Sequence, residues 1–217
     1  MDGGRNSVAG ESQQEPDMAV ILYSPASPYS AKVRMAAAWC DIGIETRIVN
    51  TEDAPADLLK TNPLGKIPAM VTDEGDGLYD SRAITQHLNR LSKGALFPRN
   101  AQKRMAAERM EALADGICDA LLAMVYERRF RPQEKIHQPW LDKQWSKVER
   151  ALDHLDANLP RATARTDGGQ IALRATLAYL DLRFADSNWR RGRAKLARWA
   201  RRFDERFVQF GELLPRA

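Results

Sequence analysis

Three serine hydroxyls lie close together in SPASPYSAKVR, residues 24–34, where a predicted strand leads into a predicted helix. Proline suits the first helical position because its missing N–H would have no partner there, so Pro28 marks the helix start and Ser27 becomes the N-cap. The first N–H groups of a helix have no partner within it, and its N-terminus carries partial positive charge. A hydroxyl at Ser27 is therefore placed to stabilise an anion such as a thiolate. The alternative is that Ser27 only caps its helix.

Other residues that could carry chemistry are few and scattered. Cys40 and Cys118 belong to no CxxC motif, and His87, His137 and His154 are separated along the chain. Metal sites need several such ligands at characteristic spacings, so we expect no metal site. Two isolated cysteines also fit a reducing, cytoplasmic setting rather than a disulfide framework.

Strand and helix patterns alternate through the part of the chain that must position Ser27. The predicted strands are 19–23, 45–49, 68–72 and 78–80, and the predicted helices are 28–42, 55–60 and 81–91. We expect Gly43 to end the first helix, EGDG at 74–77 to form a hairpin turn, and Ser81 to cap the third helix. This order, βαβα followed by ββα, predicts an open sheet with helices packed on it.

Only helical patterns follow residue 100. The long helix at 104–130 carries an apolar stripe, and further helices are predicted at 140–159, from an N-cap at Asp167 onward, and within 188–207. The chain thus divides into an α/β domain at 18–95 and an all-helical domain at 100–214. Residues 1–17 are polar, lack the layout of a signal peptide, and are expected to be a disordered extension. No apolar run is long enough to span a membrane.

Residues 188–207 contain much of the excess positive charge of a chain whose net charge is +4. Arginines with interleaved tryptophans can mark a nucleic-acid surface. However, Leu196, Trp199, Phe203 and Phe207 recur at helical spacing, which predicts one buried and one solvated face. We therefore expect only weak nucleic-acid binding that is lost near physiological salt.

Three motifs together resemble those of the cytosolic glutathione S-transferases: SPYSAKVR after the first strand, NPLGKIPAM at 62–70 and YDSRAITQHL at 79–88. The sequence looks most like a bacterial branch related to the tau and omega classes. The resemblance implies a thioredoxin-like domain followed by a helical-bundle domain, which matches the predicted elements.

The resemblance also implies roles for six residues: Ser27, Lys66, Ile67, Pro68, Asp80 and Ser81. Ser27 would hydrogen-bond the sulfur of glutathione. A cis Ile67–Pro68 bond would let the Ile67 backbone pair with the tripeptide, and Lys66 would meet its glycine carboxylate. Asp80 and Ser81 would hold the γ-glutamyl group, although Asp80 is one methylene shorter than the glutamate common in the family.

The implied function is a homodimeric, cytoplasmic transferase that conjugates glutathione to a small electrophile. The electrophile pocket would lie between the domains, and the expected lining residues are Tyr29, Met110, Leu113 and Tyr126. Packing into the core is the alternative for Met110, Leu113 and Tyr126. Omega-like relatives have cysteine where this chain has Ser27, which favours conjugation. Two alternatives stay open: a glutathione-dependent disulfide or peroxide reductase, and a non-catalytic scaffold that binds a protein or nucleic acid through the basic helix.

Overall fold

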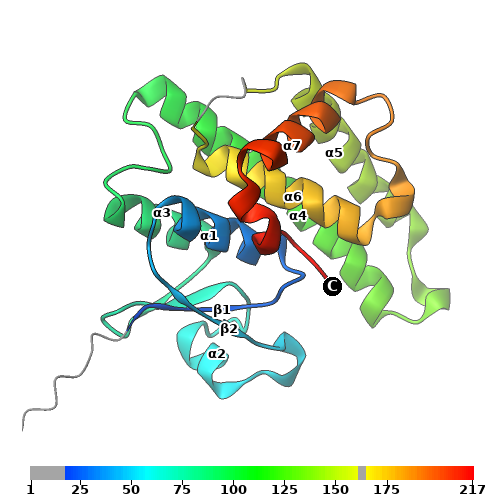
Figure 1. The fold of residues 1–217 in the computed structure, drawn as a ribbon. Coiled ribbons are helices and arrows are strands. Elements are labelled where there is room, and N and C mark those ends of the chain that lie inside the picture. Colours follow the sequence, from blue (N-terminus) through cyan, green and yellow to red (C-terminus); the bar gives the residue numbers. More distant parts are fainter. Residues whose placement is uncertain (1–17, 161–164) are drawn as a thin grey trace, which may run out of the picture.

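The computed structural model describes residues 18–160 and 165–217, so the disorder expected for residues 1–17 lies outside the described residues. Within these ranges a small four-stranded sheet with its helices forms one domain, and longer helices form a second domain above it (Figure 1). The predicted combination of an α/β domain and an all-helical domain is confirmed. No helix of the described segments combines the length and apolar character needed to cross a membrane.

The sheet has the strand order β2-β1-β3-β4. Its strands are β1 (Val20–Tyr23), β2 (Glu45–Ile48), β3 (Ala69–Val71) and β4 (Gly77–Leu78). Strand β1 runs parallel to β2 and antiparallel to β3, and β4 is antiparallel to β3. Because side chains alternate along a strand, Ile21 and Tyr23 enter the main core while Leu22 packs with Leu58 on the opposite face.

Three helices complete this domain: α1 (Pro28–Trp39), α2 (Ala56–Thr61) and α3 (Ser81–Leu91). Helices α1 and α3 lie between the sheet and the second domain, and α2 covers the other face (Figure 1). The prediction that Gly43 ends the first helix is wrong. Helix α1 ends earlier, and Asp41 adopts the left-handed conformation with φ 54° that turns the chain. Aspartate tolerates this conformation better than most residues.

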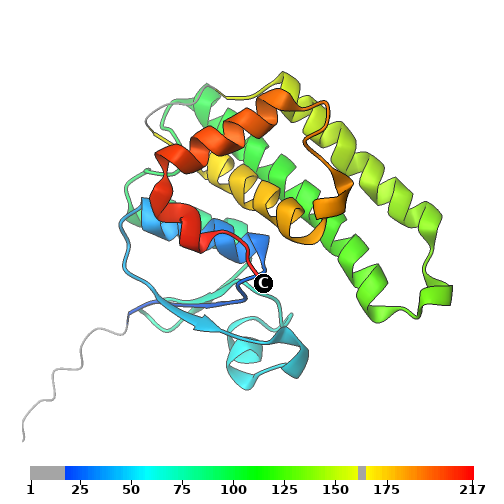
Figure 2. The same ribbon diagram turned by 45° about the vertical axis from the view of Figure 1, so that its right-hand side comes forward.

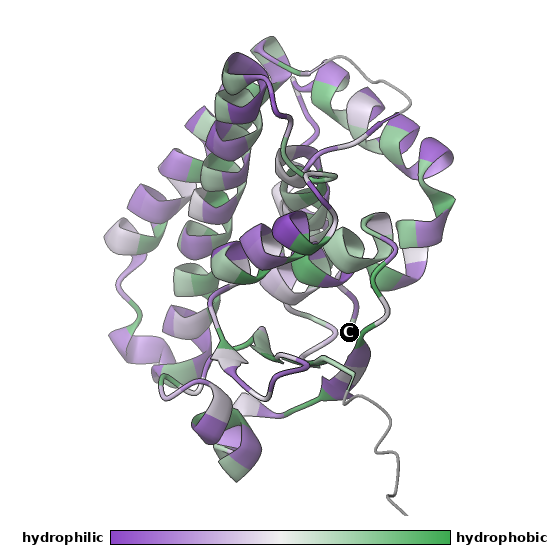
Figure 3. Ribbon diagram, turned by 90° about the vertical axis from the view of Figure 1, so that its left-hand side faces the viewer, coloured by the Kyte–Doolittle hydropathy of each residue, from purple (hydrophilic) through white to green (hydrophobic). Residues whose placement is uncertain are grey.

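The second domain consists of α4 (Ala101–Phe130), α5 (Gln138–Ala157), α6 (Gly168–Arg183) and α7 (Ala194–Arg206). Figure 2 shows α4 and α5 as long neighbouring helices. Figure 3 shows that most helices contain both hydrophilic and hydrophobic residues. The one-turn elements are η1 (Thr51–Asp53), η2 (Gln133–Lys135), η3 (Ala185–Ser187) and the longer η4 (Val208–Leu213).

Helix α6 is the centre of the helical domain, because every residue from 168 to 180 is buried. The predicted N-cap is confirmed, since the Asp167 carboxylate accepts a hydrogen bond from the N–H of Gln170 at 2.9 Å. The start of α6 packs closely against α4. A Cβ atom at Gly169 would lie only 2.4 Å from the carbonyl oxygen of Ala107, so glycine is required there.

The apolar stripe predicted for the basic helix is confirmed in α7. Leu196, Trp199, Phe203 and Phe207 are all buried. Phe203 and Phe207 have ring centroids 4.7 Å apart, within an aromatic cluster. Buried rings offer no face on which a nucleobase could stack.

Candidate functional site

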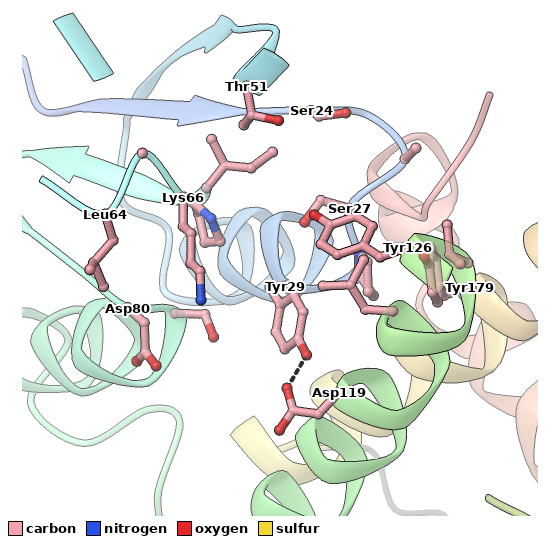
Figure 4. A pocket seen from close by; sticks show the side chains of 18 of the residues that line it. Ser24, Ser27, Tyr29, Thr51, Leu64, Lys66, Asp80, Asp119, Tyr126 and Tyr179 are labelled. Atoms are coloured by element: carbon pink, nitrogen blue, oxygen red, sulfur yellow. Dashed lines mark hydrogen bonds between the residues drawn. The ribbon is translucent and has the colours of Figure 1, made fainter. Parts of the chain in front are cut away.

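A cavity of about 410 Å³ lies where the two domains meet. Its walls come from the N-terminus of α1, the loop before β3, the start of α3, the second half of α4 and the end of α6. All six positions predicted to hold glutathione line this cavity, as do Tyr29 and Tyr126 (Figure 4). The fold thus brings together the residues of three motifs that are well separated in the sequence.

Ser27 is the N-cap of α1, as predicted. Its backbone is extended, and its Oγ accepts a hydrogen bond from the N–H of Ser30 at 3.2 Å. Accepting this bond does not use the hydroxyl proton, so Ser27 can still donate a hydrogen bond into the cavity. Capping the helix and facing an anion are therefore compatible roles for the same hydroxyl.

The loop before β3 forms the opposite wall and contains Lys66, Ile67 and Pro68. The Ile67–Pro68 peptide bond is cis, as the resemblance implied. The buried Asn62 braces the loop: its Nδ2 donates to the carbonyl oxygen of Lys66 at 2.7 Å, and its Oδ1 accepts from the N–H of Leu64 at 3.1 Å. Asn62 belongs to the NPLGKIPAM motif, but its bracing role was not predicted from the sequence.

Asp80, rather than Ser81, caps helix α3. The Asp80 Oδ1 atom accepts a hydrogen bond from the N–H of Arg82 at 3.0 Å, and Ser81 is the first residue of the helix. The correction leaves both residues in the cavity wall. The Ser81 N–H is one of the first N–H groups of α3, which have no partner within the helix and suit an anion.

Tyr29 and Asp119 form a pair that sequence reasoning did not predict. The Tyr29 hydroxyl donates a hydrogen bond to the Asp119 carboxylate across the domain boundary (Figure 4). Burial, together with the neighbouring acidic groups, raises the pKa of Tyr29 far above its ordinary value. Tyr29 therefore stays protonated, and its proton is committed to Asp119. No local pattern marks Asp119 as a site residue, because it lies within the continuous helix α4.

The helical domain contributes Tyr126 and Arg129 from α4, and Tyr179 and Arg183 from α6. Met110 and Leu113 do not line the cavity; both pack against the main core instead. A helix rises about 1.5 Å per residue, so Met110 lies roughly 24 Å along the axis from Tyr126. The apolar stripe predicted for α4 is buried, and its residues Ile117 and Leu121 belong to the main core. The C-terminal half of α4 lines the cavity through other residues.

A buried ionic cluster joins the two domains behind the site. The Lys32 Nζ atom of α1 contacts Asp115 at 2.9 Å and Glu111 at 3.2 Å, and the Lys32 side chain is only 2% exposed. Arg82 also pairs with Asp115, and the Thr85 hydroxyl donates to Glu111 at 3.0 Å. Burial raises the pKa of Glu111, while the ammonium group of Lys32 opposes that rise.

In the part of the chain that the structure describes, no group of three or more His, Cys, Asp or Glu side chains could hold a metal ion. The chemistry that the cavity offers is the stabilisation of an anion at the N-termini of α1 and α3, beside hydrogen-bonding groups for an extended peptide.

The known proteins that this chain matches are described as glutathione S-transferases or as GST-like. Residues 22–95 match the family model of the glutathione S-transferase N-terminal domain. The chain is 32% identical over 175 residues to the uncharacterized GST-like protein YibF of Escherichia coli K12, which covers 78% of this chain and 85% of that protein.

Two solved structures are similar over nearly the whole chain. One is a glutathione S-transferase from Methylobacillus flagellatus with glutathione bound, at 35% identity and a TM-score of 0.83, covering 91% of this chain and 100% of that one. The other is a glutathione transferase family member from Pseudomonas fluorescens with bound S-(propanoic acid)-glutathione, at 33% identity and a TM-score of 0.79, covering 91% and 100%.

Proposed function

Because this chain belongs to the glutathione S-transferase family, we propose that its interdomain cavity binds glutathione and activates the thiol for attack on a small electrophile. The observation that carries the proposal is the position of Ser27. Its hydroxyl lies at the N-terminus of α1, in the cavity wall, with its proton free to be donated. The glutathione-bound relatives support the choice of thiol substrate.

The tripeptide would lie along the cavity in an extended form. The N-terminus of α3 at Ser81 suits the γ-glutamyl carboxylate. Asp80 uses Oδ1 for its cap, which leaves Oδ2 for the γ-glutamyl ammonium group. The Ile67 backbone would pair with the peptide as an added strand does, and Lys66 would meet the glycine carboxylate.

Activation would require no general base in the protein. Lowering a thiol pKa from about 8.5 to about 6.5 takes about 2.7 kcal/mol in favour of the thiolate. A hydrogen bond from Ser27 to the charged sulfur supplies about 1.5–3 kcal/mol, and the helix N-terminus adds about 0.3–1 kcal/mol. The thiol proton leaves to solvent. The thiolate then forms a carbon–sulfur bond, and the leaving group departs with the electron pair of its bond to carbon.

Reduction of disulfides on the same fold is the second candidate. A protein thiolate would help that reaction, yet no cysteine of the described ranges lines the cavity. Burial raises the pKa of Cys118 to about 12 and also raises that of the half-buried Cys40, so neither is an activated thiol. The Pseudomonas fluorescens relative supports conjugation, because its bound S-(propanoic acid)-glutathione carries a carbon substituent on the glutathione sulfur.

A homodimer is part of the proposal. Leu91 on α3 and Met105 on α4 are 53% and 59% exposed. A second copy that covered them would remove this apolar surface from water. Sedimentation at micromolar concentration is expected to give twice the 24.5 kDa mass of the chain. A particle of the monomer mass would contradict the dimer without affecting the catalytic proposal.

The catalytic proposal is tested by retention on immobilised glutathione, followed by turnover. We expect retention that free glutathione reverses, and conjugation of activated aryl halides faster than reduction of a small mixed disulfide. Faster disulfide reduction would favour the reductase. Absence of both retention and turnover would favour a non-catalytic scaffold.

A further inference from the structure

The part of the cavity formed by the helical domain is both aromatic and cationic. Tyr126 and Arg129 on α4, with Tyr179 and Arg183 on α6, form what we call the cationic wall. Each arginine lies three or four residues after a tyrosine, so tyrosine and arginine share a helix face. Burial raises the pKa of Tyr179 to about 12, and the charges of Arg183 and Arg129 act against that rise, so these groups lie near one another.

The positive charge of this wall is only partly neutralised. Arg129 pairs with Glu52 at 3.4 Å, and their side chains are 44% and 58% exposed. The Asp119 carboxylate also lines the cavity and accepts the hydrogen bond of Tyr29, but it forms no ion pair with Arg129 or Arg183. Within residues 18–160 and 165–217, Arg183 has no carboxylate at ion-pair distance. The Arg183 guanidinium thus borders the cavity without a counter-ion among the residues that the structure describes.

The cationic wall is also separate from the residues proposed to hold the tripeptide. Figure 4 shows Lys66 and Asp80 at one end of the cavity and Tyr126 and Tyr179 at the other, with Ser27 and Tyr29 between them. A ligand group next to the cationic wall would therefore belong to the second substrate, on the far side of the sulfur from Lys66.

We propose that the cationic wall selects electrophiles that carry a carboxylate or sulfonate on an aromatic or apolar body. The proposal rests on the proposed transferase function. The two tyrosines would flank the body, and Arg183 would pair with the anion, which a planar guanidinium can bind through two N–H groups. A neutral electrophile would bury part of Arg183 without providing a counter-charge.

Two matched electrophiles test this selection: 4-chloro-3,5-dinitrobenzoate and the corresponding benzamide. Both react by forming a carbon–sulfur bond while chloride leaves with the electron pair of the carbon–chlorine bond. The kcat/KM of each with the full chain and saturating glutathione is divided by its uncatalysed rate constant. We expect the wild-type protein to prefer the benzoate, and added salt to reduce the preference because Arg183 is exposed.

Substitution of Arg183 should remove this preference. Arg183→Gln is expected to lower kcat/KM for the benzoate about tenfold, mainly through KM, and for the benzamide by less than about threefold. Arg129→Gln should have a smaller effect on the benzoate, because Glu52 already neutralises part of its charge. Arg128→Gln is the matched control, since Arg128 is exposed on α4 next to Arg129 but does not line the cavity.

Two results would overturn the selection while leaving the transferase proposal intact. One is a wild-type protein that turns over the benzamide at least as well as the benzoate after normalisation. The other is an Arg183→Gln variant whose KM for glutathione rises instead, which would assign Arg183 to the tripeptide. If neither electrophile reacts and glutathione does not retain the protein, the transferase proposal fails and the selection fails with it.

Discussion

Replacement of Ser27 by alanine is expected to lower kcat/KM for conjugation by about 10- to 100-fold, the effect of losing one hydrogen bond to a charged group. The affinity for glutathione should fall much less, because the peptide is held at Lys66, Ile67, Asp80 and Ser81. The pH profile of kcat/KM provides a second measurement. Its apparent pKa should rise in Ser27→Ala toward the value of about 8.5 for a free thiol, because the thiolate loses its donor.

Capping and chemistry can be separated at this position. Ser27→Asp keeps an N-cap of similar quality but places a negative charge next to the thiolate, so stability should be retained while activity is lost. Ser24→Ala is the matched control, because Ser24 also lines the cavity and contributes only its carbonyl oxygen to the hydrogen bond from Ser27. Equal activity of the Ser24→Ala and Ser27→Ala variants would contradict the assignment.

Replacement of Lys32 by methionine is expected to lower the free energy of unfolding by about 3–5 kcal/mol, the usual effect of leaving a buried charge unpaired. Methionine nearly fills the same volume but leaves Glu111 and Asp115 without the ammonium group that lies between them. Arg82 still pairs with Asp115 from the surface, so Glu111 should account for most of the loss. Urea unfolding at one fixed protein concentration measures the change.

The matched control for this cluster is Lys103→Met, because Lys103 is exposed on α4 and should change stability by less than about 0.5 kcal/mol. Adding Glu111→Gln to Lys32→Met should recover part of the loss, since the uncompensated carboxylate is then removed. A Lys32→Met variant that unfolds within about 1 kcal/mol of wild type would show that the buried cluster contributes little.

Features that depend on neighbours within one or two turns could be predicted from the sequence. Pro28 with Ser27 indicated both the start of α1 and its cap, and Asp167 indicated the start of α6; the structure confirms these caps. Periodicity indicated the buried stripe of α7. The choice of Ser81 as a cap was wrong by one residue, because either Asp80 or Ser81 could supply the capping oxygen and only the backbone path selects between them.

Contacts between elements far apart in the chain were decided only by the tertiary structure. Nothing near Asp119 in the sequence indicates that Tyr29 is its partner, and nothing near Lys32 indicates Glu111. Each pairing depends on how α1 is rotated against α4. The same packing decides that the C-terminal half of α4 lines the cavity while Met110 joins the core. An apolar stripe determines that a helix face is buried, but the burial of apolar surface is non-directional, so the stripe does not determine which neighbour covers each turn.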